Sequence, residues 1–476
     1  MLATVSSLLA LRNRHWLVAT FLFIAAFINL LDTTIVNLAL PEIQFDLDAT
    51  NSQVQWILVI YIIAFAAGLL PFGRFGDTFG RRRMFLSGLF GFIAASIACG
   101  FAPDVETLIA ARLVKGLAAA MMLPQVLAIV HATFPEKDAG RAIGYFAMVN
   151  GLGALAGPIV GGLLITADLF GLGWRLVFLV NLPLGLVSFA GICVFLPRLS
   201  QVRMQNADWF GALLVAIGAI TLLYPLIEGR TQNWPFWINA YFAVSALMFI
   251  LFWRHQHHLA ARNLTQLLPV TILHNRQFLL GVAILTSLFM GVAGPMVILS
   301  ITLQAGLHLS AAQSGLILAA HPLSAALMSM LSGRLGPRQL KARALLGILS
   351  LLIGIIWLQA IMSLDVTPYA FWGPLASIGA GIGVAIVALF QIVLKEVSSQ
   401  DAGAGSGAMQ ACQQIGIAIG IAMTGKLFFA SLGLASDPSH YVQAFRHALW
   451  FPIILYAGLF FAAIFAFSEQ TPPHKP

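Results

Sequence analysis

The chain has 476 residues, of which 60% are apolar and only 9% are charged, and its formal net charge is +8. About a quarter of the residues of a soluble domain are usually charged, so this composition excludes an ordinary soluble protein. A helix needs about 20 apolar residues to cross the hydrocarbon of a bilayer, and runs of that length recur along the whole chain. The composition therefore predicts an all-α polytopic membrane protein.

We predict fourteen transmembrane helices, which leave no room for a soluble domain. In chain order they cover residues 16–40, 52–72, 84–103, 106–130, 142–165, 175–196, 209–228, 236–253, 278–303, 311–332, 344–363, 368–394, 402–429 and 447–467. The three cysteines, Cys99, Cys193 and Cys412, fall inside these helices, so we expect no disulfide and no thiolate metal site. His255, His257 and His258 lie in a predicted loop without a neighbouring cysteine or carboxylate, which favours a solvated loop over a metal site.

The basic residues gather on one side of the predicted helices. Of the 25 Lys and Arg residues, Arg112 and Lys115 fall inside a helix, and the side opposite the N-terminus holds Arg175, Arg230, Lys426 and Arg446. All the others lie on the side of the N-terminus, and cytoplasmic loops are the ones enriched in basic residues. We therefore predict a multi-pass protein of the cytoplasmic (inner) membrane with both termini in the cytoplasm. Attraction to anionic lipid explains the net charge, so we expect no nucleic-acid partner.

An internal repeat divides the chain. The segment GRFGDTFGRRR at 73–83 shares glycines and arginines at the same offsets with GRLGPRQLKAR at 333–343, a displacement of 260 residues. A second similarity, of AGRAIG at 139–144 with AGAGSG at 402–407, has a displacement of 263 residues. Parallel six-helix repeats occur in transporters whose substrate site lies between the halves. We predict an N-terminal six-helix bundle at 1–196, a linker with two inserted transmembrane helices at 197–276, and a C-terminal six-helix bundle at 277–476.

The first predicted helix carries a carboxylate, Asp32, in the stretch NLLDTTIVNLALP at 29–41. A charge near the bilayer centre costs about 2.5 to 3.5 kcal/mol, so such residues pair and mark ion pathways. Asn29, Thr33 and Asn37 share its helix face within about 140°. Arg112 is the expected partner, because the first helix runs outward and reaches Asp32 late, while the fourth runs inward and reaches Arg112 early. We favour proton coupling through this pair over a permanent salt bridge that only joins two helices.

Lys115 lies three residues after Arg112, on the same face of the fourth helix. It either loses its proton, shares Asp32 with Arg112, or neutralises an anionic substrate. We therefore hypothesise a preference for neutral or anionic lipophilic compounds over dications.

Other polar residues inside the predicted helices are candidates for a substrate cavity, although each serves equally well as a hydrogen bond between helices. They are Asn29, Thr33, Asn37, Gln125, Asn150, Gln304, His321, Gln391, Gln410, Gln413 and Gln414.

Two glycine-containing segments are predicted to take part in the movement of the two halves and in close helix packing. In the predicted loop 73–83, glycines permit a tight turn, and Asp77 can form ion pairs with the arginines at 81–83 that differ between two orientations of the halves. In GALAGPIVGG at 153–162, Gly153, Gly157 and Gly161 are four residues apart and form a smooth ridge that lets another helix approach closely.

Together with LLDTTIVNLALP, RLVKGLAAAMMLP at 112–124 and WRLVFLVNLPLG at 174–185, these segments resemble the motifs of the major facilitator superfamily. The fourteen-span count resembles its drug:proton antiporter-2 branch. The resemblance implies a cytoplasmic conformational latch at Gly73, Asp77, Gly80, Arg81, Arg82 and Arg83. It also implies an antiporter motif that seals the gate against proton leak, formed by Gly153, Gly157, Pro158, Gly161 and Gly162. The chain departs from the branch at Lys115, where the motif usually has Gln.

The resemblance implies proton-coupled export, by antiport and alternating access, of small lipophilic compounds or drugs. The expected partners are a small-molecule substrate, protons and the lipid bilayer, with the proton gradient as the driving force and no cofactor. An enzyme is not expected, because no set of nucleophile and base appears in the sequence. The alternatives are an exporter dedicated to a single metabolite and a non-transport membrane scaffold or lipid flippase. The sequence leaves open whether accessory envelope proteins take part.

Overall fold

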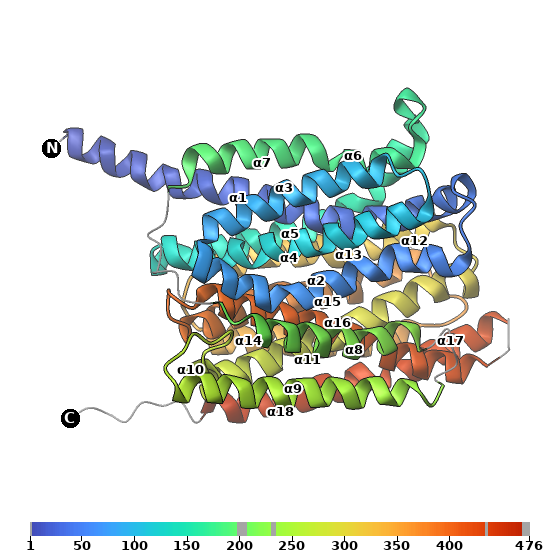
Figure 1. Ribbon diagram of the computed structural model, residues 1–476. Helices are drawn as coiled ribbons and strands as arrows, with labels where there is room; N and C mark the ends of the chain where they lie inside the picture. Colours follow the sequence, from blue (N-terminus) through green and yellow to red (C-terminus); the bar gives the residue numbers. More distant parts are fainter. Residues whose placement is uncertain (1, 198–206, 230–234, 434–436, 469–476) are drawn as a thin grey trace.

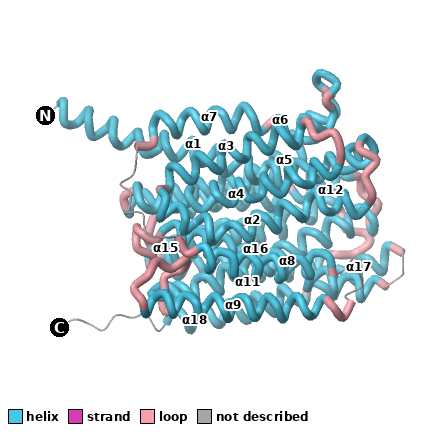
Figure 2. Tube along the Cα trace, viewed as in Figure 1, coloured by secondary structure: helices cyan, strands magenta, loops and turns pink. Residues whose placement is uncertain are grey.

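The computed structural model describes residues 2–197, 207–229, 235–433 and 437–468, and in this part it contains helices and no strands (Figure 2). The N-terminal helices are α1 (Leu2–Asp46), α2 (Asn51–Phe79), α3 (Arg81–Gly100), α4 (Val105–Thr133), α5 (Glu136–Ala167), α6 (Leu176–Leu179) and α7 (Asn181–Phe195). The next two are α8 (Trp209–Glu228) and α9 (Ile238–Ala261). The C-terminal helices are α10 (Val270–Leu273), α11 (Arg276–Ile301), α12 (Ala311–Leu318), α13 (Ala320–Arg334), α14 (Leu340–Ile361), α15 (Trp372–Lys395), α16 (Ala402–Leu432), α17 (Pro438–Ala448) and α18 (Trp450–Ser468).

The structure confirms the predicted all-α class and span count, because 14 helical segments in the described part are long and apolar enough to cross a membrane. They run along a common direction, with α1, α3 and α7 toward the top of the view in Figure 1 and α11 and α18 toward the bottom. The two groups meet along two seams, where α5 packs on α13 and α2 packs on α16. Helix α8 packs on α9 and also contacts α2 and α16, so the inserted pair lies against both groups. The domain boundaries at 197 and 276 stay a prediction.

Three predicted single helices are each divided near one end. The sixth is divided at Val180, the tenth at Ala319 and the last at Leu449. A proline follows three residues later in every case, at Pro183, Pro322 and Pro452. Proline has no N–H to donate to the carbonyl four residues before it, so the regular hydrogen-bond ladder ends there. At the last of these breaks a separate amphipathic helix, α17, precedes the membrane helix.

The segment 73–83 differs from its prediction as a loop. Helix α2 continues to Phe79, and a single residue, Gly80 with a φ of 102°, makes the turn to α3. Gly73 and Gly76 lie inside the helix instead. A Cβ atom on Gly73 would meet the backbone of Gly403 in α16, so this glycine permits close packing of the two halves and is not a turn residue. We call the end of the bundle that contains Gly80 the latch end.

At the opposite end, Asp46 ties the end of α1 to the turn that precedes α6. Its Oδ2 accepts hydrogen bonds from Trp174 Nε1 at 2.9 Å and from Arg175 Nη1 at 2.7 Å. These two hydrogen bonds hold the pKa of the Asp46 carboxyl below its usual value. The carboxylate therefore stays charged at neutral pH and fixes how α1 meets the sixth span.

The glycine ridge of 153–162 packs against α1, as a ridge that admits a close neighbour should. An added Cβ would meet the carbonyl oxygen of Phe27 at Gly153, the Thr34 side chain at Gly157, and Ile35 at Gly161. At Gly162 an added Cβ would meet no described atom within 4 Å, so there is space for a methyl group at this position. Pro158 lies on α5, and its side chain is outside the described residues.

Replacing Gly157 by alanine should destabilise the protein, because the new methyl group would collide with Thr34 in α1. Overpacking of this kind costs about 1 to 3 kcal/mol. The matched change Gly162→Ala adds the same methyl group to open space on the same helix and should leave stability unchanged or slightly higher. The measurement is the temperature at which the purified protein loses its monodisperse peak in size-exclusion chromatography. Equal temperatures for the two variants would contradict the packing of α1 on α5.

Candidate functional site

The structure brings Asp32, Arg112 and Lys115 together in one buried cluster. Arg112 Nη1 donates to Asp32 Oδ2 at 2.7 Å, and Lys115 Nζ donates to Asp32 Oδ1. The three side chains are 0%, 1% and 0% exposed, respectively. Of the three alternatives for Lys115, the structure shows the one in which Lys115 and Arg112 share the Asp32 carboxylate.

Helix geometry places the cluster away from the latch end. Asp32 lies eight residues before Leu40, the end of its apolar span, which is about 12 Å along the axis. Arg112 lies seven residues after Val105, the first residue of α4, which is about 10 Å. The two helices run in opposite directions, so both residues reach a similar depth from the same end. Arg112 and Lys115 are three residues apart and share the face of α4 that contacts α1.

Two further groups orient the cluster. Asn181, at the start of α7, donates from Nδ2 to Asp32 Oδ1 at 3.0 Å. Arg112 Nε donates to the backbone carbonyl of Ile57 in α2 at 2.9 Å. The cluster therefore connects α1, α2, α4 and α7. Sequence reasoning missed Asn181, although it belongs to the segment WRLVFLVNLPLG that carries part of the family resemblance.

Aromatic rings surround the two cations. The Arg112 guanidinium lies 4.3 Å from the centroid of the Tyr61 ring, and the Tyr61 hydroxyl donates to Asn29 Oδ1 at 2.6 Å. Lys115 Nζ lies 4.7 Å from the Phe92 ring and 5.1 Å from the Phe178 ring. The negative faces of these rings stabilise positive charge. The surroundings thus favour cations in a cluster that carries one negative and two positive groups when all three are ionised.

The remaining polar candidates on α1 are engaged within their own helix or open to the surroundings. Thr33 Oγ1 donates to the Asn29 carbonyl at 2.9 Å, and the exposed Asn37 donates from Nδ2 to the carbonyls of Thr33 and Thr34 at 3.4 Å. Asn37 is thus the exposed polar candidate on this face of α1.

The candidates outside α1 differ in their hydrogen-bond partners. Gln125 donates to the Phe72 carbonyl at 2.8 Å, and Gln391 lies beside Gly140 in the α5–α13 seam, so both pack between helices in this conformation. Asn150 and Gln304 bond within their own segments, to the Phe146 carbonyl and to Ser300 Oγ. Among these candidates, the buried polar atoms without a described hydrogen-bond partner are Gln125 Oε1, His321 Nε2 and Gln410 Nε2. Gln413 and Gln414 are half-buried.

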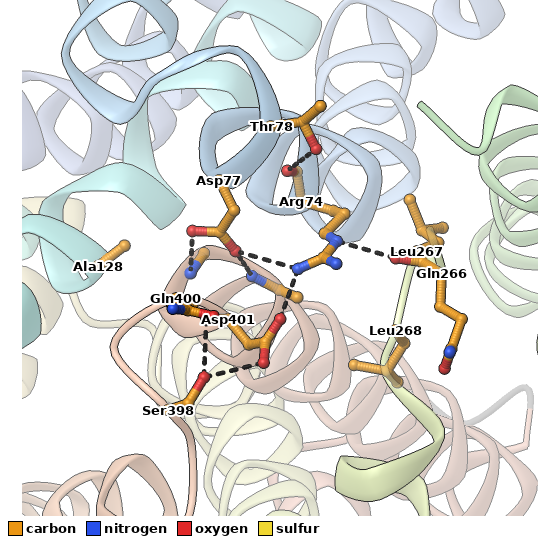
Figure 3. Close-up of polar contacts among 12 residues, drawn as sticks. Arg74, Asp77, Thr78, Ala128, Gln266, Leu267, Leu268, Ser398, Gln400 and Asp401 are labelled. Atoms are coloured by element: carbon orange, nitrogen blue, oxygen red, sulfur yellow. Dashed lines mark hydrogen bonds and ion pairs between the residues drawn. The ribbon is translucent and has the colours of Figure 1, made fainter. Parts of the chain in front are cut away.

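Asp77 closes the latch end by binding the start of α16, as Figure 3 shows. Its Oδ1 accepts from the Gly403 N–H at 3.0 Å and its Oδ2 from the Ala404 N–H at 2.9 Å. A carboxylate is favourable at a helix N-terminus, where N–H groups are unpaired and the helix dipole is positive. Arg81 binds Asp77 Oδ1 at 2.7 Å and also donates to the Ser399 carbonyl. The carboxylate and its arginine therefore hold the two halves together.

Arg74 makes a second contact between the halves (Figure 3). Its Nη1 lies 2.6 Å from Asp401 Oδ1, and its Nε donates to the Gln266 carbonyl at 2.8 Å. Arg82 and Arg83 do not take part in these contacts. Arg82 donates to the Cys193 carbonyl on α7, and Arg83 is exposed. Successive residues point 100° apart on the first turn of α3, so only one of the three arginines can face α16.

The latch continues into the inserted helices through a chain of hydrogen bonds. Next to Gln266, the N–H groups of Leu267 and Leu268 donate to Gln256 Oε1 at 2.8 and 3.3 Å. Gln256 Nε2 donates to Asp208 Oδ2 at 2.8 Å, and His255 Nε2 lies 2.9 Å from Asp208 Oδ1. The predicted solvated histidine loop is therefore wrong, because α9 extends to Ala261 and Asp208 lies opposite His255. No group of three or more His, Cys, Asp or Glu residues suited to a metal occurs among the described residues.

Replacing Asp77 by asparagine should open the latch end more often, because an amide offers one acceptor oxygen and no charge for Arg81. Charged hydrogen bonds of this kind are each worth about 1.5 to 3 kcal/mol, which corresponds to roughly tenfold or more in the population of the open state. The measurement is the rate of maleimide labelling of Ser406→Cys, a buried residue of this seam, in a background with Cys99, Cys193 and Cys412 changed to serine. Asp437→Asn is the control, because Asp437 is 77% exposed and lies beyond α16 at the other end. A labelling rate equal to that of the control would argue against the latch.

The comparisons with known proteins agree with this architecture. The sequence profile of the Major Facilitator Superfamily matches residues 22–224 and 208–421. A protein named as the probable actinorhodin transporter of Streptomyces coelicolor is 36% identical over 430 residues, which are 90% of this chain and 74% of that protein. The multidrug resistance protein Stp of Mycobacterium tuberculosis is 31% identical over 422 residues, which are 87% of this chain and 75% of that protein.

Among solved structures, the proton:xylose symporter XylE superposes with a TM-score of 0.66 and 14% identity, over 96% of each chain. This similarity concerns the fold alone. The matching profile covers most of the chain, and the relatives are transporters of small molecules and not enzymes. The chain therefore belongs to the Major Facilitator Superfamily and resembles its multidrug exporters.

Proposed function

We propose that this protein exports small lipophilic compounds in exchange for protons across the cytoplasmic membrane, with both termini in the cytoplasm. The family and the multidrug-resistance name of one relative support export of drugs. The observation that carries proton exchange is the cluster of one buried carboxylate with two cations, Asp32 with Arg112 and Lys115. Buried ionisable groups inside membrane helices usually serve ion pathways.

The charges of the cluster explain how it would exchange a proton. With all three groups ionised it carries a net charge of +1, and burial of net charge is costly. Loss of one proton from Lys115 makes the cluster neutral, whereas Arg112 stays charged in either state. The exchangeable proton then belongs to the Asp32–Lys115 pair.

Helix α4 supplies the mechanical connection between this cluster and the latch. It carries Arg112 and Lys115 in one half of the membrane and Pro124 nearer the latch end, about 18 Å along the axis from Arg112. The Pro124 carbonyl accepts from Ser406 Oγ in α16 at 2.8 Å. A shift of α4 that follows a change of charge in the cluster would therefore move the Pro124 carbonyl and change its contact with α16. In alternating access, closure of the latch end is expected to accompany opening of the opposite end.

Asp32→Asn should abolish proton exchange, because the two cations lose their shared carboxylate. The measurement is substrate-induced movement of protons in proteoliposomes across a panel of lipophilic compounds. Asp46→Asn is the matched control, since it makes the same chemical change at the end of the same helix outside the cluster. Substrate-driven proton movement that persists in Asp32→Asn, in vesicles where Asp46→Asn also transports, would remove the cluster from the mechanism.

Lys115→Gln should change which substrates are accepted. Without the second cation, lipophilic anions should lose export by roughly tenfold, the effect of one charge-assisted hydrogen bond, and dicationic dyes should gain. The readout is the ratio of initial export rates for an anionic and a dicationic dye of similar size. Strong export of the dication by the unaltered protein, with no change in the variant, would rule out a charge preference set by Lys115.

A second candidate function is export of a single metabolite. It is supported by the relative that is 36% identical and named for transport of one compound, actinorhodin. The same compound panel separates the two functions, because a dedicated exporter should move protons in response to one chemical class and a multidrug exporter in response to several. A scaffold or lipid flippase would respond to no compound in the panel.

A further inference from the structure

A cavity of about 750 Å³ lies near the latch end and outside the Asp32 cluster. Its walls come from one face of α1, with Trp16, Phe23 and Phe27, and from Tyr145 of α5 and Leu184 of α7. Thr20, on the same face of α1, is exposed. The cavity is therefore an apolar, aromatic-lined groove between α1 and the two helices that flank it.

Two arginines contributed by opposite halves of the protein also line this cavity. Arg141 comes from α5 and Arg334 from α13, and both are exposed. The contact between these helices is close, because a Cβ added to Gly144 would lie 2.7 Å from the Cα of Gly333. Arg141 Nη1 lies 3.6 Å from Asp138, and Arg334 Nη2 contacts Met330 Sδ at 3.9 Å. No ion pair of Arg334 occurs among the described residues, so the positive charge of the rim exceeds the negative charge.

The dimensions of the groove match one leaflet of a bilayer. Its α1 wall runs from Trp16 to Phe27, eleven residues or about 16 Å, and half of the hydrocarbon core is about 15 Å. Trp16 and Arg141 lie at the beginnings of their membrane spans, and Arg334 lies at the end of its own. The cations therefore stand at the depth of lipid headgroups, and the aromatic wall extends toward the bilayer centre.

We propose that this groove binds one anionic phospholipid, with its phosphate between Arg141 and Arg334 and an acyl chain along α1. Arginine suits phosphate because its planar fork of donors binds two oxygens at once. The two arginines flank one headgroup only while α5 and α13 are in contact. The lipid thus joins the halves in the conformation with the closed latch and stabilises it. This binding is independent of the proposed proton exchange.

Lipid binding to the full-length purified protein tests the site. Phosphatidylglycerol and phosphatidylcholine with the same acyl chains are titrated, and native mass spectrometry counts the bound lipids. We expect one phosphatidylglycerol to bind more tightly than phosphatidylcholine. The double variant Arg141→Gln with Arg334→Gln should weaken phosphatidylglycerol binding about tenfold or more and leave phosphatidylcholine unchanged. Arg262→Gln is the control, because it removes an exposed cation at the end of α9 outside the groove.

Thr20→Trp provides a second variant that keeps both arginines and fills the groove, so it should reduce binding of both lipids. In bilayer discs, labelling of Ser406→Cys should be slower with phosphatidylglycerol than with phosphatidylcholine, and the difference should vanish in the double variant. Unchanged phosphatidylglycerol binding in both variants would overturn the proposal. Displacement of the lipid by inorganic phosphate alone would show that the site binds a free anion. Displacement by a lipophilic anion that the protein then exports would show that it binds a substrate. Either result would also overturn the proposal.

Discussion

The arrangement of the N-terminal helices depends on one carboxylate. Asp32 binds two buried cations, and with Asn181 and the Ile57 carbonyl it joins four helices at one depth of the membrane. A single charge at the bilayer centre costs about 2.5 to 3.5 kcal/mol, so removal of the shared acid would leave two such costs uncompensated. The cluster is stable only as a whole, and its net positive charge makes it responsive to one proton.

The contact between the halves depends on the absence of side chains. Gly73 meets Gly403 on one seam and Gly144 meets Gly333 on the other, so backbones approach each other directly. Helices packed so closely lose their contacts together when they separate, which favours two discrete arrangements over a continuous range. Asp77 then adds charged hydrogen bonds to the N-terminus of α16. The inserted pair takes part in this closure, because the segment that follows it binds Arg74 through Gln266.

Much of the fold and part of the site could be predicted from the sequence. Apolar runs predicted the fourteen spans because the bilayer imposes both length and composition on each helix. The pairing of Asp32 with Arg112 followed from the direction of two neighbouring spans and the cost of an unpaired charge. Asn181 was missed because an asparagine near a helix break is usually local in its effect. Arg82 and Arg83 take no part in the described contacts of the closed latch, because a charge run in sequence spreads over different helix faces once α3 begins at Arg81.

The sequence by itself determined what each segment must do to exist in a membrane: where it spans, which side holds the cations, and that a buried acid needs a basic partner. The tertiary structure alone decided which glycines meet which backbones, that Lys115 shares Asp32, and that Arg141 and Arg334 flank one groove. The physical reason is that the free energy of burial in lipid depends on each residue separately, so its effect can be predicted from the sequence of one chain. Close packing and charge sharing are properties of pairs, which the chain brings together only when it folds.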